Sequence, residues 1–359
     1  MKQPYSLVTR ISFVAVVWIV LLAGVLYLPD LVQSVYAPRV IHVLTWGGVI
    51  DPLYIRSFEQ KTGIQVRLSY YASNEELRVK MQKTKGQGYD LIMPSDYMVG
   101  LLSKEGLLKK IDRTKLPPES AFYPFLLHHA FDPHNDYSLP FCWEVYGIGY
   151  DKRFFTDGLP DSSWKLLFDN PHGKYKVVMT NDPIEAVLCA AQYLFGNVDR
   201  LTDEQSEQIR LLLKEQHQWV EAYASARAGY FLVTGTSPLA FTTTTYIWQA
   251  RQHTDQLGFF IPQEGGFMSI ESIALPLGGE HDDLVYQFLA FLYQPQSYIH
   301  HFQQFSNIPA LREPSIEQSL GVTVESFLQD FSSSFGRLGF FHRILPESYL
   351  NDLWVDVKN

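Results

Sequence analysis

The stretch Tyr89-Asp-Leu-Ile-Met-Pro-Ser-Asp-Tyr97 decides the fold. Asp90 to Met93 is predicted to be a short buried strand that Pro94 ends, because such a run bounded by turn residues is typical of a parallel sheet core. Ser95, Asp96 and Tyr97 are expected on the loop that follows, and open α/β sheets bind ligands just beyond the carboxyl ends of their strands. A hydroxyl, a carboxylate and a phenol, with no Lys, Arg or glycine cradle beside them, favour a small polar or cationic ligand over a phosphate.

Strands and helices alternate on the amino-terminal side of this stretch. Strands are expected at 40–45 and 65–70. A helix is expected from Asp51-Pro52, which supply an N-cap and a first-turn proline, to Gly63, which ends it. A second helix is expected to open with the capping box Ser73-Asn-Glu-Glu76 and to reach about Lys85. This β-α-β-α-β order predicts a right-handed parallel sheet with helices on both faces.

A second α/β region is predicted after a turn-rich segment at 133–140. Helices are expected to open at Asp182-Pro183 and at Thr202-Asp-Glu-Gln205, the latter reaching about Tyr223. Further strands are expected at 141–150, 175–180, 239–245, 258–262 and 272–276, and further helices at 282–293, 296–304 and 347–357. With 359 residues, the chain has the length of about two domains.

The amino-terminal 37 residues form a targeting segment. Lys2 and Arg10 give it a positive start, and Ile11 to Leu28 is an uncharged, mostly apolar run. Such a pattern is typical of a signal sequence, and the run is also long enough to span a bilayer. Val35-Tyr-Ala37 has the spacing of a cleavage site, but a proline follows it. The segment is therefore expected to be a cleaved signal or an uncleaved anchor, and in both cases the rest of the chain is exported.

Charge and cysteine content narrow the possible partners. The formal net charge of −9 disfavours nucleic acid and acidic lipid surfaces and mildly favours cationic ligands. The aromatic content of 14% fits either aromatic packing or a pocket that recognises cations and rings. Cys142 and Cys189 are the two cysteines, and the sequence allows either one disulfide or two buried thiols.

Signatures of catalysis and of metal binding are absent from the sequence. It has no nucleophile elbow, no HExxH and no Walker A motif, so we expect no enzyme and no catalytic residue. The adjacent pairs His128-His129 and His300-His301 lack a cysteine or carboxylate framework, and neighbouring histidines on a helix point apart. We therefore expect no metal and no cofactor.

Asp182-Pro-Ile-Glu185 has two interpretations. As a capping box, Asp182 is the N-cap and Glu185 closes the first turn, which accounts for both carboxylates. As a site, the same carboxylates stand at a helix start after a strand, where they can meet an ammonium group. Trp46, just past the first expected strand, is likewise either a core residue or a ring that stacks on a ligand.

Taken in order, these segments resemble the spermidine/putrescine-binding receptors of ABC importers, from about Val40 to the carboxyl end. The resemblance is carried by Trp46, Phe58-Glu-Gln-Lys-Thr-Gly-Ile64, Tyr71-Ala-Ser-Asn-Glu75, the opening stretch, Lys104-Glu-Gly106, Lys109-Lys-Ile-Asp112, Phe131-Asp-Pro-His-Asn-Asp-Tyr-Ser-Leu-Pro140, Gly265-Gly266 and Ser272-Ile-Ala-Leu-Pro276. It implies a two-lobed periplasmic-binding-protein fold (type II), an α/β fold of mostly parallel sheets flanked by helices with a ligand cleft between the lobes. The implied lobes are 40–144 plus 270–314 and 150–264 plus 320–359.

The resemblance also implies a ligand site. Trp46, Ser95, Tyr97, Asp182 and Glu185 match pocket positions of the family, and Glu271 stands where the family has an Asp that binds a central amine. Thr243 and Ser269, with Val49 and Asn307, stand where the family typically has aromatic rings, and Gly47 replaces a small polar residue. In the family, a set of aromatic rings called the aromatic box flanks the ligand. The carboxylates of the site are therefore retained here, while much of this aromatic box is not.

The expected function is that of a periplasmic receptor that binds a putrescine- or spermidine-class polyamine and delivers it to the permease of an ABC importer. Such a receptor is expected to be a monomer that performs no chemistry and binds no nucleic acid. The altered box leaves two alternatives. One is a same-fold receptor for another small cationic or polar solute, and the other is a membrane-anchored polyamine sensor.

Overall fold

The computed structural model describes residues 13–19, 22, 24–25, 39–170, 173–320 and 336–359. The expected export segment, 1–37, falls largely outside these described residues. Among the residues that are described, no helix is both long enough and apolar enough to cross a membrane.

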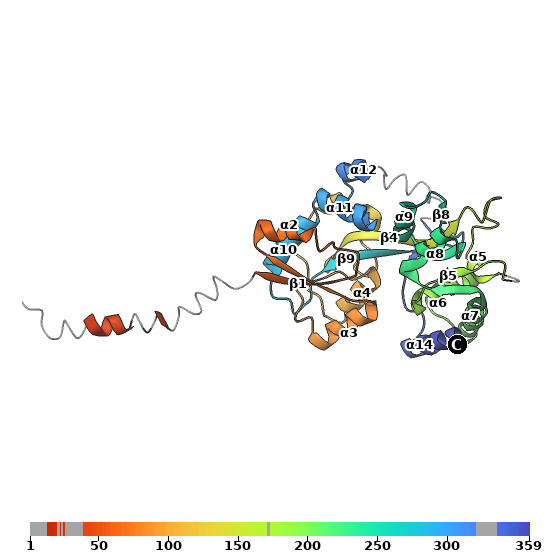
Figure 1. The fold of residues 1–359 in the computed structure, drawn as a ribbon. Coiled ribbons are helices and arrows are strands. Elements are labelled where there is room, and N and C mark those ends of the chain that lie inside the picture. Colours follow the sequence, from red (N-terminus) through yellow and green to blue (C-terminus); the bar gives the residue numbers. More distant parts are fainter. Residues whose placement is uncertain (1–12, 20–21, 23, 26–38, 171–172, 321–335) are drawn as a thin grey trace, which may run out of the picture.

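The first half of the fold is the expected alternation of strands and helices. Strands β1 (Val40–Thr45), β2 (Gln65–Tyr70) and β3 (Leu91–Ile92) are parallel, with β1 in the middle, and helices α2 (Ile55–Thr62), α3 (Asn74–Thr84) and α4 (Asp96–Lys104) follow them in turn. Helices α10 (Asp282–Leu292), α11 (Pro295–Phe305) and α12 (Pro314–Leu320) return to this half later in the chain (Figure 1). The parallel core predicted for this half is confirmed.

Two long strands connect the halves. Strand β4 (Ser138–Asp151) pairs antiparallel with β9 (Gly266–Ala274) and with β10 (Ile308–Pro309). Its carboxyl-terminal part continues into the other half, where it pairs with β7 (Leu239–Thr243) and β8 (Leu257–Phe260). The described strands consequently form one 11-stranded sheet through both halves, in the order β2-β1-β3-β9-β4-β7-β5-β6 along its main path.

The second half is again α/β. Parallel strands β5 (Val177–Met179), β6 (Val220–Tyr223) and β7 form its centre, with β11 (Leu338–Phe340) on β9. The helices of this half are α5 (Lys165–Phe168), α6 (Pro183–Phe195), α7 (Asp203–Gln216), α8 (Ala228–Thr234), α9 (Thr244–Arg251) and α14 (Glu347–Lys358). Pairing is therefore parallel within each half, and the antiparallel pairs come from the connecting strands.

Several boundaries differ from expectation. Helix α2 begins at Ile55, because Asp51 accepts a hydrogen bond from Leu53 N at 2.8 Å in a turn and does not cap the helix. Strand β3 spans two residues only. Helix α7 ends at Gln216, because 220–223 forms strand β6.

Two corrections concern the expected site. Ser95, Asp96 and Tyr97 do not lie on a loop: Ser95 is the N-cap of α4, and Asp96 opens the helix with its apolar face in the core. The strand expected at 272–276 is the end of the longer β9, which starts at Gly266. Ser269 and Glu271 therefore lie inside a strand, where their directions are fixed by the sheet.

The carboxylate of Asp90 links three segments at the centre of the first half by hydrogen bonds. Its side chain is 4% exposed and accepts hydrogen bonds from His42 N on β1 at 2.9 Å and from Glu280 N and His281 N, before α10, at 3.1 and 3.2 Å. One carboxylate thus joins β1, the start of β3 and the approach to α10.

We expect Asp90→Ala to lower the free energy of unfolding by about 2–3 kcal/mol, because it leaves three N–H groups that bond the buried carboxylate without an acceptor. Urea denaturation measures the change. The control is Asp136→Ala, which removes an exposed ion pair with Lys110 and is expected to change stability by about 0–1 kcal/mol. Equal effects of the two substitutions would contradict the role of Asp90.

Candidate ligand-binding site

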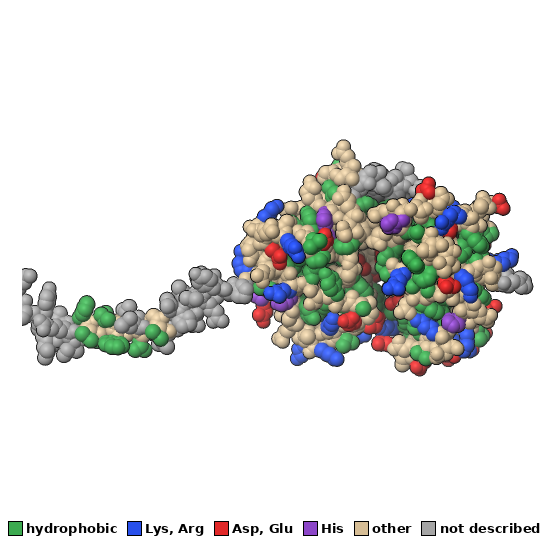
Figure 2. All heavy atoms as spheres, viewed as in Figure 1, with side chains coloured by type: hydrophobic (Ala, Val, Ile, Leu, Met, Phe, Trp, Pro, Cys, Tyr) green, Lys and Arg blue, Asp and Glu red, His purple; other side chains and the backbone are tan. Residues whose placement is uncertain are grey.

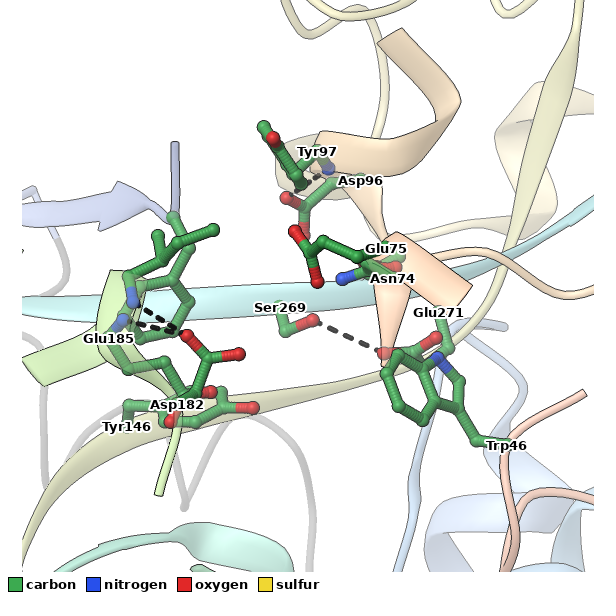
Figure 3. Close-up of a pocket in the computed structure, with 13 residues that line it drawn as sticks. Trp46, Asn74, Glu75, Asp96, Tyr97, Tyr146, Asp182, Glu185, Ser269 and Glu271 are labelled. Atoms are coloured by element: carbon green, nitrogen blue, oxygen red, sulfur yellow. Dashed lines mark hydrogen bonds between the residues drawn. The ribbon is translucent and has the colours of Figure 1, made fainter. Parts of the chain in front are cut away.

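A pocket lies between the two halves, where β9 passes from one to the other. Figure 2 shows this face of the molecule hollowed between the halves, and Figure 3 shows the pocket itself. We call it the inner pocket; its empty space amounts to about 540 Å³, part of which is open to solvent. Its described lining residues are Trp46, Asn74, Glu75, Ser95, Asp96, Tyr97, Tyr146, Asp182, Ile184, Glu185, Ser269, Glu271 and Phe341.

The first half contributes the starts of α3 and α4. Ser95 donates to the side-chain oxygen of Asn74 at 3.0 Å, which joins the two helix starts. Asp96 is 2% exposed, and its two carboxylate oxygens accept from Ile270 N at 2.8 Å and from Tyr97 N at 2.6 Å. It therefore holds α4 against β9. Burial raises the pKa of Asp96 to about 7.

The second half contributes the start of α6. Asp182 caps this helix by accepting from Ile184 N at 2.7 Å and from Glu185 N at 3.2 Å. Glu185 accepts a short hydrogen bond from the hydroxyl of Thr180. Burial raises the pKa of Asp182, and burial together with the neighbouring Asp182 charge raises the pKa of Glu185 well above its usual value. Capping and pocket lining are therefore not alternatives, because the same two carboxylates do both.

Glu271 lies on β9 beside Trp46, and Ser269 lies between it and the carboxylates of Asp182 and Glu185 (Figure 3). Ser269 donates to one of its oxygens at 3.3 Å, while the other oxygen is buried and has no hydrogen-bond partner among the described residues. Burial, and then the charges of Glu144 and Asp96, raise the pKa of Glu271 well above its usual value. Glu271 thus keeps an unused acceptor inside a strongly negative environment.

The pocket as a whole is acidic. Five carboxyl groups line it, and its described lining residues include no Lys, Arg or His. Glu144, opposite Ser269 in the β4–β9 register, adds a sixth close by, and burial raises its pKa. Burying charges of one sign without an opposite charge is unfavourable. Such an arrangement is suited to a ligand that brings positive charge.

Seven of the eight expected site residues line this pocket, namely Trp46, Ser95, Tyr97, Asp182, Glu185, Ser269 and Glu271. Thr243 does not: it is buried and caps α9, where its hydroxyl accepts from Tyr246 N at 3.3 Å. Thr243 is nevertheless close to the pocket. Its side chain and that of Thr245 hydrogen-bond Glu144, the residue opposite Ser269, and lower the pKa of Glu144 against the larger effect of burial.

The remaining positions at which the family typically has rings serve the structure here. Val49 is buried in the core of the first half, and Asn307 donates to the carbonyl of Gly48 at 2.8 Å. The two cysteines, Cys142 and Cys189, are both buried and free. The described residues also contain no group of three or more side chains suited to a metal ion.

The sequence placed the Asp96 carboxylate on the stretch expected to face a ligand, but it did not identify the residues Asn74, Glu75, Glu144, Tyr146, Ile184 and Phe341. Asn74 and Glu75 were visible in the capping box after Ser73 without being assigned to the pocket. Tyr146 and Phe341 come from strands and loops far apart in the sequence, and no local pattern brings them together.

Comparisons with known proteins agree with this geometry. The family model described as bacterial extracellular solute-binding protein matches residues 54–315. The spermidine/putrescine-binding periplasmic protein of Escherichia coli (strain K12) is 29% identical over 255 residues, covering 71% of this chain and 73% of that protein. A putrescine-binding periplasmic protein of Pseudomonas aeruginosa (strain UCBPP-PA14) is 28% identical over 301 residues, covering 79% and 82%.

The fold is also found in solved structures. The TpPotD lipoprotein of Treponema pallidum superposes with a TM-score of 0.76 at 22% identity, covering 89% of this chain and 99% of that one. The expected two-lobed periplasmic-binding-protein fold (type II) is thereby confirmed. With the family model extending over most of the described fold, the chain belongs to the bacterial extracellular solute-binding proteins.

Proposed function

We propose that this chain is a periplasmic receptor that binds a polyamine of the putrescine/spermidine class and delivers it to an ABC importer. The observation that carries the proposal is the inner pocket, where five carboxyl groups meet without a Lys, Arg or His among the described lining residues. The polyamine-binding relatives named above support it. The family consists of transport receptors, and nothing in the proposed function requires a catalytic step.

The ligand is held at its charged ends and along its chain. One ammonium lies near Asp182 and Glu185, and a second nitrogen lies near Glu271. Trp46 and Tyr97 offer ring faces to the cations, each worth about 0.5–2 kcal/mol. Each charge-assisted hydrogen bond adds about 1.5–3 kcal/mol, so two ends and a stacked chain reach the roughly 8 kcal/mol of micromolar binding.

Binding couples the two lobes. In this proposal they comprise 40–144 with 270–314 and 150–264 with 320–359, joined by β4 and β9. A dication that contacts carboxylates of both lobes binds the closed arrangement better than an open one, so it shifts the population towards closure. The closed receptor is the form that an ABC permease in the inner membrane would recognise.

A different small cationic solute is the second candidate. The observation that favours it is that Ser269 and Thr243 stand where the family typically has aromatic rings. A pocket with fewer rings makes fewer contacts with the methylene chain of a polyamine. The carboxylates of the pocket serve either ligand equally.

We expect Glu271→Gln to weaken binding of putrescine or spermidine by about 2–5 kcal/mol, because an ammonium in the closed cleft loses its partner. Isothermal titration calorimetry at matched ionic strength measures this loss. The control is Glu204→Gln on the exposed face of α7, which is expected to leave the affinity unchanged. An affinity within about threefold of wild type, with the fold intact by circular dichroism, would move the anchor to Asp182 and Glu185.

We expect the ligand-free protein to lose stability as pH rises from about 5 to about 8. The folded pKa of the pocket carboxyls lies above the unfolded value, so the folded state holds extra protons in this window and each titrating group lowers the free energy of unfolding by about 1 kcal/mol per pH unit. For Asp96 the window runs from 3.8 to about 7. Thermal melts of wild type and Asp96→Asn across this range measure the effect.

The Asp96→Asn profile is expected to be shallower than that of wild type, and saturating putrescine is expected to flatten the wild-type profile, because the ammonium stabilises ionised carboxylates. Asp136→Asn is the control, since its ion pair with Lys110 lowers the pKa of Asp136 and places its titration below the window. A wild-type profile that is level or rising would refute the account.

We expect Ser269→Trp to tighten polyamine binding by about 0.5–2 kcal/mol, because it returns a ring face to the middle of the cleft. Ser269→Ala is the matched control, since it removes the hydroxyl beside Glu271 without adding a ring. Calorimetry with spermidine compares the three proteins. A loss of affinity in the Trp variant alone would show that the pocket has been reshaped for another cation.

A further inference from the structure

A second cavity adjoins the inner pocket. The empty space of this outer cavity amounts to about 780 Å³, part of which is open to solvent. Its described lining residues are Ser73, Glu75, Asn181, Asp182, Pro183, Ile184, Arg343, Glu347, Leu350 and Asn351. Glu75, Asp182 and Ile184 line both spaces. Because Glu75 and Asp182 come from opposite halves and face each other across the cleft, they form the boundary between the two cavities (Figure 3).

Arg343 stands at this boundary. Its guanidinium lies 3.7 Å from the carboxylate of Glu75 and donates to Glu347, at the start of α14, at 2.9 Å. The next residue, Ile344, is buried in the core of the second half, whereas Leu77 on the helix of Glu75 is buried in the first. The ion pair with Glu75 therefore crosses from one half to the other.

Arg343 is the cation that the protein places in the lining of the two cavities. Among the described residues lining either cavity, it is the single cationic side chain. Burial and the charge of Asp182 raise the pKa of Glu75, and the charge of Arg343 opposes that rise. Glu75 is thus partly neutralised by the protein itself, while Asp182, Glu185, Glu271 and Asp96 are left for the ligand.

A fixed guanidinium has two effects on a flexible polycation. It competes with the ligand for Glu75, and it repels any ammonium group that extends from the inner pocket into the outer cavity. A diamine held by Asp182 and Glu185 at one end and by Glu271 at the other, as proposed above, does not use Glu75 and meets neither effect. A longer polyamine that extends into the outer cavity brings its additional charged nitrogen close to Arg343.

We propose that Arg343 is a specificity-determining residue, a counter-ion supplied by the protein that closes the outer end of the pocket and selects short diamines over longer polyamines. The inference rests on the proposed polyamine function and specifies its ligand class. Arg343 does not itself line the inner pocket but pairs with Glu75, which does, so we expect its effect on the relative affinities of ligands of different length.

The test compares putrescine, spermidine and spermine by calorimetry at constant ionic strength. Wild type is expected to bind putrescine more tightly than spermine. In Arg343→Met the affinity for spermine is expected to rise about tenfold or more, with putrescine within about threefold of wild type. Arg343→Lys keeps the charge and is expected to keep the wild-type order. Arg343→Gln is a second neutral variant if the Met variant loses its circular dichroism signal.

Arg78→Met is the matched control. Arg78 lies on the same helix as Glu75, pairs with Glu105 at 2.5 Å and lines neither cavity, so its loss changes the net charge equally without freeing Glu75. It is expected to leave the ratio of affinities unchanged. A spermine-to-putrescine ratio in both neutral Arg343 variants that stays within threefold of wild type overturns the inference alone. Wild type that binds none of the three amines overturns the proposed function as well.

Discussion

The antiparallel pairing of β4 with β9 is the contact on which the rest of the structure depends. The ladder runs from Ser138 opposite Ala274 to Tyr146 opposite Phe267, and β4 then continues into the second half. The same register sets the site, because Ser269 and Glu271 share one face of β9 and Glu144 lies opposite Ser269. A shift of this register by one residue would turn these side chains away from the cleft. The β4–β9 pairing therefore both connects the halves and positions the centre of the pocket.

That pairing concentrates negative charge where the protein excludes water. A fold selected for stability alone would place neutral or paired groups there, since buried like charges are unfavourable. Here Asp96 and Asp182 are held in place by backbone N–H groups, which keeps the carboxylates ordered before any ligand arrives. For the proposed cation site, this means that preorganisation costs stability when no ligand is bound, as is common at functional sites.

Local sequence signals predicted the framework well. Ser73 and Asp182 cap their helices as expected, and Gly63 ends α2 in the left-handed conformation with φ of 68°. Such signals act over a few residues, so they appear directly in the sequence. The resemblance to a receptor family supplied seven of the residues that line the inner pocket, because its motifs preserve positions that local patterns cannot bring together.

The missed features depend on contacts between distant segments. Arg343 and Glu75 are separated by most of the chain, and only the packing of Ile344 in one core and Leu77 in the other brings them together. The loop expected at Ser95 to Tyr97 was wrong for a local reason, since the apolar residues that make α4 a helix follow the polar ones. The middle of β9 was missed because Ser269 and Glu271 interrupt its apolar pattern at the positions used by the ligand site.

The balance between rings and carboxylates determines what kind of selectivity this cleft can have. Rings contact methylene groups and cations alike, so an aromatic box recognises the length of a carbon chain as well as its charge. In this protein Val49 and Asn307 serve the structure, Thr243 caps a helix and Ser269 supports a carboxylate. The groups left to discriminate between ligands are charged, and charges act on the number and spacing of the nitrogens. In the proposed function, recognition in this cleft is therefore governed by where positive charge is needed and, at Arg343, by where the protein already supplies it.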